Sequence, residues 1–158
     1  MIRPSKIDTG AGHSYSRRMP LGPHTWVLGL RLAGILHFIT LAMACFTPIP
    51  PDWDENFARL PEVHRRFALA QNAFIGAVIA VSGIVSLVFA PLLVQQSTLA
   101  RVICACIALW WGGRLVVLPW LKAHQFLKST ALVAGFVLLL VECAVYTLAY
   151  GYLALSRL

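Results

Sequence analysis

Four long runs of apolar residues alternate with shorter polar stretches along the chain. Each run is long enough to cross a bilayer as a helix, because a hydrocarbon core about 30 Å thick needs roughly 20 helical residues. The runs cover residues 26–46, 67–94, 99–120 and 130–155. The pattern therefore predicts an all-α protein, an integral membrane four-helix transmembrane bundle.

Prolines and a helix-capping residue mark the ends of these runs. Proline lacks the backbone N–H that a helix interior needs, and serine readily caps a helix start. The marks are Pro48, Pro50 and Pro51 after the first run, Pro91 late in the second, Pro119 late in the third and Ser129 before the fourth.

The segments outside the runs have different characters. Residues 1–24 are polar and basic, and they are predicted to form a flexible tail before a transmembrane domain at residues 25–158. The stretch at residues 47–66 is the only sizeable loop between runs. Its proline-rich start predicts a turn, and the rest predicts a short helix at the membrane surface.

The composition fits a protein whose surface faces lipid. Hydrophobic residues make up 59% of the chain and charged residues 12%, against about 45–50% and about 25% in soluble domains. The net charge of +7 does not indicate nucleic-acid binding, because the cations stand at the ends of apolar runs rather than on one polar face.

The charges near the runs also predict an orientation. Arg17 and Arg18 precede the first run, and four of the six acidic residues lie in the loop at residues 47–66. Cytoplasmic segments of membrane proteins carry an excess of lysine and arginine. We therefore expect both termini in the cytoplasm, the 47–66 loop outside, and a multi-pass protein of the inner (plasma) membrane.

Two stripes of small residues are candidates for close helix packing. Such residues let helix backbones approach one another in lipid. The stripes are Ala73, Gly76, Ala80 and Gly83 in the second run, and Ala105, Ala108 and Gly112 in the third. We predict that the two stripes pack against one another, or that one of them faces a partner subunit.

Ionisable residues inside the runs are the first candidates for function, because charge is costly in hydrocarbon. Arg114, His37 and Glu142 are predicted to descend through the bundle from the outer side in that order. Asn72 is placed to join the top of this series. The series indicates one of three roles. The first is structural, an Arg114–Glu142 contact, direct or through His37, that fixes the helix register. The second is a working polar pocket, and the third is an interface with another subunit.

Motifs for catalysis or metal binding are missing from the sequence. His64 and His124 fall at the outer interface as possible surface contacts, and not at the depth of His37 that paired haem ligation requires. No H-E-x-x-H motif, C-x-x-C pair or nucleotide-binding loop occurs. The sequence predicts no catalytic residue and no metal, and it leaves the cofactor unknown, with a lipid or a quinone as possibilities.

Two stretches of the chain resemble known membrane proteins. They are residues 60–67 (LPEVHRRF), followed by Asn72 and residues 74–76, and residues 99–101, leading into residues 108–115 (ALWWGGRL). They resemble uncharacterised bacterial four-span inner-membrane proteins, whose third helix carries a similar Trp-x-x-Arg-Leu element, matched here by Trp111 and Arg114. The resemblance implies a bacterial inner-membrane setting and a four-helix fold, and it implies no activity.

These features favour a non-enzymatic accessory or assembly subunit of a larger membrane complex. Its partners would be the lipid bilayer and either other membrane proteins or further copies of the chain. Two alternatives stay open. One is a small homo-oligomeric proton-coupled transporter that uses Glu142, and the other is a membrane redox protein that holds a quinone, haem or lipid near His37 and Arg114.

Overall fold

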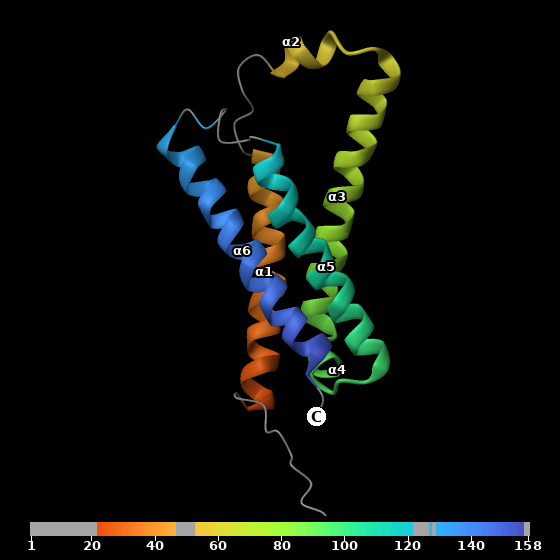
Figure 1. Ribbon diagram of the computed structural model, residues 1–158, viewed down its shortest axis with the longest axis vertical. Coiled ribbons are helices and arrows are strands. Elements are labelled where there is room, and N and C mark those ends of the chain that lie inside the picture. The colour runs from red at the N-terminus through yellow and green to blue at the C-terminus, as the bar shows by residue number, and fades with distance from the viewer. Residues whose placement is uncertain (1–21, 47–52, 122–126, 128, 157–158) are drawn as a thin grey trace, which may run out of the picture.

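The computed structural model describes residues 22–46, 53–121, 127 and 129–156, and every regular element among them is a helix (Figure 1). Four helices are long and apolar enough to cross a membrane, which confirms the predicted all-α four-helix transmembrane bundle. They are α1 (Pro23–Phe46), α3 (Glu62–Val88), α5 (Thr98–Trp120) and α6 (Thr130–Leu155). Two short helices join them, α2 (Trp53–Ala58) and α4 (Ala90–Val94).

The second span differs from its prediction at both ends. Helix α3 begins at Glu62, five residues earlier than expected, directly after the proline at its N-cap. The expected continuous helix to residue 94 is wrong, because the backbone leaves helical geometry at Phe89 and resumes as α4. Pro91 explains this break, since its ring cannot donate a helical hydrogen bond and clashes with the preceding turn.

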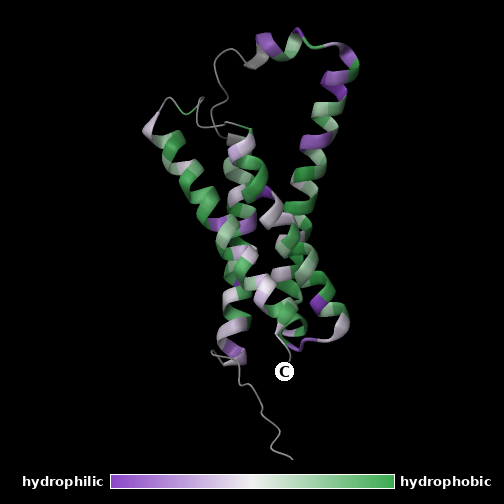
Figure 2. Cartoon of the chain, viewed as in Figure 1, coloured by the Kyte–Doolittle hydropathy of each residue, from purple (hydrophilic) through white to green (hydrophobic). Residues whose placement is uncertain are grey.

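The bundle has two distinct ends. Helix α1 begins where α6 ends, and the rings of Trp26 and Tyr152 stack there with centroids 5.3 Å apart. At this same end, named here the α4 end, Arg101 Nε donates to the carbonyl of Ala154 near the last turn of α6. The other end carries α2, and Figure 2 shows hydrophilic residues gathered on α2 and the start of α3. The predicted tail lies almost wholly outside the described residues.

Small residues bring the helices together in two pairs, α1 with α3 and α5 with α6. A Cβ at Gly83 of α3 would meet Phe38 and His37 of α1. A Cβ at Gly112 of α5 would meet Thr147 of α6 at 3.3 Å. The prediction that the two stripes pack against one another is therefore wrong, because each stripe packs on a different neighbour.

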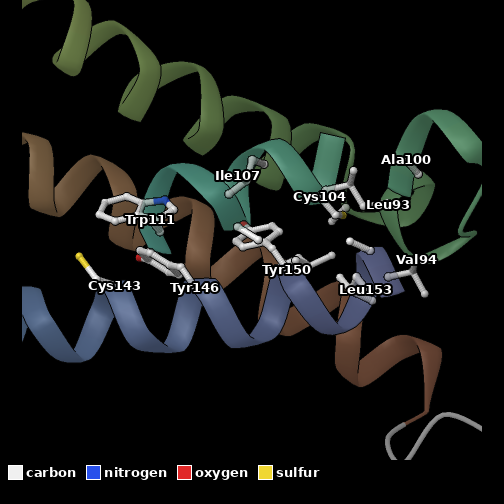
Figure 3. Close-up of a cluster of buried hydrophobic side chains, with 14 of the residues drawn as sticks. Leu93, Val94, Ala100, Cys104, Ile107, Trp111, Cys143, Tyr146, Tyr150 and Leu153 are labelled. Carbon is white, nitrogen blue, oxygen red and sulfur yellow. The ribbon is translucent and has the colours of Figure 1, made fainter. Parts of the chain in front are cut away.

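The buried core fills the half of the bundle nearer the α4 end. Trp111, Tyr146 and Tyr150 are at most 2% exposed and lie between α5 and α6 (Figure 3). Toward the α2 end, α3 and α6 diverge (Figure 1), and Phe67 and Trp120 are 70% and 80% exposed. The two halves of the bundle therefore differ, one closely packed and one open to lipid.

Because α1 and α3 pack closely at Gly34, we expect a larger side chain at this position to destabilise the protein. A Cβ there would lie 2.6 Å from Leu87 Cγ and 2.9 Å from the carbonyl oxygen of Gly83. Because one of these atoms is backbone, Gly34→Ala must push the helices apart, and we expect a loss of about 1–3 kcal/mol of stability. Unfolding in a denaturing detergent titration measures it.

Gly29→Ala is the matched control on the same helix, since a Cβ at Gly29 meets nothing within 4 Å. Alanine is the better helix former, so this variant should be as stable as the wild type or slightly more stable. Equal stability of the Gly34 and Gly29 variants would contradict the close approach of α1 and α3.

Candidate functional site

Three aromatic side chains from three helices form a layer across the middle of the bundle. They are His37 of α1, Trp111 of α5 and Tyr146 of α6, each at most 2% exposed. The imidazole stacks on the Tyr146 ring at 4.3 Å between centroids and meets the Trp111 ring edge-on at 5.2 Å. This set, the aromatic layer, fills the space between these helices with side chains.

Hydrogen bonds fix the protonation of His37. Its Nδ1 lies 2.7 Å from the carbonyl oxygen of Ala33, one turn earlier in α1. Its Nε2 lies 3.1 Å from Trp111 Nε1, and an indole N–H can only donate. Nε2 therefore accepts, Nδ1 carries the proton, and the imidazole is neutral. Both ring nitrogens are occupied, so neither is available to ligate a metal or haem.

A second interhelical hydrogen bond links α6 to α3. Ser86 Oγ donates to the carbonyl oxygen of Ser82 at 2.7 Å, so the hydroxyl of Tyr150 donates in turn to Ser86 Oγ. All three side chains are buried. Together with the His37–Trp111 bond, this chain satisfies polar groups that hydrocarbon cannot hydrate, and it holds α3 and α6 at one register.

Three polar residues lie one helical turn closer to the α2 end. Thr40, Arg114 and Glu142 are displaced by three or four residues from His37, Trp111 and Tyr146, respectively. The Thr40 hydroxyl donates to Glu142 Oε2 at 2.6 Å. The Arg114 guanidinium lies over the Trp111 ring, 5.6 Å from its centroid. This set is named the polar layer, and all its members are partly exposed.

The depth order predicted from the sequence is wrong for Glu142. Its bond to Thr40 places it on the α2 side of His37, at the level of Arg114, rather than below both. The expected pairing of Arg114 with Glu142 is also not formed. Salt bridges in the described part of the chain lie elsewhere, Arg59 with Glu55 and Arg66 with Glu62. His37 cannot bridge the two charges, because Ala33 and Trp111 occupy its nitrogens.

Arg114 is left incompletely satisfied. Its Nη1 is buried and has no hydrogen-bond partner in the structure. Arg114 and Glu142 both belong to the polar layer, although they do not form a salt bridge. A guanidinium N–H without an acceptor is costly at membrane depth, so this atom is the clearest open position in the interior.

The remaining predicted site residues do not join these layers. Asn72 is exposed on α3, so the structure does not bring it to the polar layer. His64 is exposed in the first turns of α3, consistent with a surface position, and His124 lies outside the described residues. Thr40, Trp111, Tyr146 and Ser86 were not predicted. Two signals were available, the Trp-x-x-Arg element of Trp111 and Arg114 and the spacing of Tyr146 and Tyr150, four residues apart within an apolar run.

Comparison of the chain with protein-family models, with curated proteins and with solved structures found no match. The resemblance to bacterial four-span proteins therefore stays an expectation.

The contribution of the His37–Trp111 hydrogen bond to stability can be tested by changing two adjacent tryptophans. Trp111→Phe keeps an aromatic ring and leaves His37 Nε2 buried without a donor, so we expect a loss of about 1–3 kcal/mol. Trp110→Phe is the control, because Trp110 Nε1 has no hydrogen-bond partner to lose. Detergent unfolding titrations of both variants provide the comparison.

Combining Trp111→Phe with His37→Leu separates the bond from simple packing. Removing both partners should cost less than the sum of the single changes, by about 1 kcal/mol, because neither group is then left unsatisfied. Additive costs, or equal costs at positions 110 and 111, would contradict the assigned hydrogen bond.

Proposed function

We propose that this multi-pass membrane protein is a non-enzymatic subunit of a larger membrane complex. In this proposal a transmembrane helix of a partner protein docks in an external groove between α5 and α6. The groove has a volume of about 530 Å³ and is almost wholly apolar. Five of its nine lining residues are small, namely Ala108, Gly112, Gly113, Thr147 and Gly151.

The shape of this groove is the observation that carries the proposal. Helices associate in lipid through close packing, which small residues permit, and not through hydrophobic burial. Gly113 lies in the groove, and a Cβ there would meet nothing within 4 Å, so none of the described residues fills the space that it leaves. Leu109, Leu148 and Leu155 stand on the same surface, all more than 70% exposed, and they offer apolar contacts to the sides of an incoming helix.

The state of the bundle centre supports a subunit role over a carrier or an enzyme. Trp111 of α5 is hydrogen-bonded to His37 of α1, and Tyr150 of α6 to Ser86 of α3. All four side chains are buried, so their polar atoms hold the chain together. The aromatic layer also stands between the polar layer and the α4 end. A proton route based on Glu142 would have to cross these packed rings.

The proposed setting is the bacterial inner membrane, with the α4 end in the cytoplasm. This orientation places the arginine-rich tail inside and the acidic 47–66 loop outside, as the distribution of positive charge favours. The groove residues lie around the middle of α5 and in the last ten residues of α6, so the partner helix would be met from the middle of the membrane toward the cytoplasmic side.

Gly113→Leu tests the docking surface with little effect on the fold, because the new side chain enters open space and leucine favours helix. Tagged protein is extracted from its native membranes in mild detergent, and stoichiometric partners are quantified by mass spectrometry. We expect the partner in constant ratio with the wild type and about tenfold less with Gly113→Leu.

Gly135→Leu is the matched control, since Gly135 lies on α6 outside the groove and a Cβ there also meets nothing within 4 Å. It should retain the partner at the wild-type ratio. Equal retention by both variants, or a purified particle that contains this chain alone, would contradict the proposal. A particle of two or more copies that Gly113→Leu dissociates would assign the groove to self-association instead.

A further inference from the structure

The walls of the groove between α5 and α6 are held in place by contacts within the chain. Thr147 Oγ1 donates to the carbonyl oxygen of Cys143 at 2.6 Å, and its methyl group lies against Gly112. At the α4 end of the groove, the ring of Tyr152 is stacked on Trp26 with an angle of 5° between the two planes. A partner therefore meets a preformed shape, and docking has little of this chain to order.

The volume of the groove corresponds to large side chains. An apolar cavity of about 150 Å³ accommodates one benzene-sized group. The groove has a volume of about 530 Å³, so roughly three large apolar side chains of a docked helix would fill it. A partner face made of glycine and alanine would leave much of this space empty, and empty space in an interface forfeits dispersion contacts.

The exposed leucines of the groove favour the same conclusion. Leu109 of α5 and Leu148 of α6 are 75% and 73% exposed and line the groove beside its small residues. Leu109 precedes both Gly112 and Gly113 by one helical turn, so its side chain stands next to them. The backbone of a third helix is thereby kept away from the two glycines, and its side chains have to reach into the groove.

The length of the groove sets the spacing of these side chains. Along α6 the groove runs from Thr147 to Leu155, a rise of about 12 Å. Positions i, i+4 and i+7 of a helix lie on one face and span about 10.5 Å. Three large side chains with this spacing match the groove along its whole length.

Tyr152 indicates the character of the side chain nearest the α4 end. Trp26 covers one face of its ring, yet Tyr152 lines the groove and is 37% exposed. A further aromatic ring can pack on this exposed part in an offset-stacked or edge-to-face arrangement. The groove is almost wholly apolar, and the Thr147 hydroxyl already donates within α6, so a charged side chain would enter it without a partner.

We infer that the partner helix is recognised by three large apolar side chains at positions i, i+4 and i+7, of which the one nearest the α4 end is aromatic. These side chains enter the groove, and the aromatic ring packs against Tyr152. The inference rests on the proposed docking function and specifies the chemistry of the partner's face. It excludes a face of small residues and a face that carries a charge.

Two synthetic transmembrane peptides test this recognition on the full chain in phosphatidylcholine liposomes. Both are lysine-flanked, with leucines in one half for insertion and alanines in the other, and both carry a dansyl group that accepts energy from tryptophan. In the alanine half, the knob peptide has leucine, leucine and phenylalanine at positions i, i+4 and i+7, with the phenylalanine nearest the flanking lysines. The smooth peptide keeps alanine at these three positions.

Energy transfer from the protein to each inserted peptide is measured across a range of peptide-to-lipid ratios. We expect half-saturation with the knob peptide at a ratio about tenfold lower than with the smooth peptide. Gly113→Leu should remove this preference, because the new side chain fills part of the groove. Gly135→Leu should keep it, because Gly135 lies outside the groove.

A third peptide with leucine in place of the phenylalanine tests the contact with Tyr152. It should bind the wild type about threefold more weakly than the knob peptide, as expected for loss of one aromatic pair. Tyr152→Leu should bind these two peptides equally. A threefold difference that persists in Tyr152→Leu would contradict the assigned aromatic contact.

Equal or tighter binding of the smooth peptide, or a knob preference that is unchanged in Gly113→Leu, would overturn the inference. Loss of the native partner from Gly113→Leu, without any preference for the knob peptide, would overturn only this recognition and leave the proposed docking standing. A preference for the knob peptide that requires Gly113, without a native partner in the purified particle, would support the recognition and overturn the proposed complex.

Discussion

Polar groups inside a lipid-embedded bundle must find partners within the protein, and this constraint organises the structure around His37. Apolar burial drives little association between helices in a bilayer, so close backbone approach and interhelical hydrogen bonds have to hold them. The bond from Trp111 to His37 joins α5 to α1, and the bond from Tyr150 to Ser86 joins α6 to α3. With the glycine contact of α1 and α3, these bonds connect all four spans.

The need for hydrogen-bond partners within the protein also distinguishes polar groups that are fully hydrogen-bonded from those that are not. Every polar atom of the His37 ring has a partner, and the ring is fully buried. One turn away, Arg114 keeps an unpartnered Nη1 in a partly exposed layer. In this account the proposed function belongs to the α5–α6 groove, where Gly113 leaves space that the described part of the chain does not fill.

The spans were predictable from the sequence because the length of an apolar run reflects bilayer thickness directly. The contacts of His37 were not, because lipid-facing and interior-facing residues are equally apolar and the pattern does not give the rotation of each helix. The error for Glu142 has a related cause. The limits of apolar runs fix depth only to about a turn, whereas the bond to Thr40 depends on the exact pairing of α1 with α6. The groove was missed because the stripe containing Gly112 was assigned to the wrong neighbour.

The central claim is that His37 is a neutral, doubly hydrogen-bonded connector between α1 and α5. Nitrogen NMR of protein labelled at histidine and tryptophan tests it most directly in lipid bilayers. The account predicts that His37 has a protonated Nδ1 and an unprotonated Nε2 at neutral pH, with a coupling across the bond from the Trp111 indole proton to Nε2. A proton on Nε2, a doubly protonated ring, or no coupling to Trp111 would contradict it.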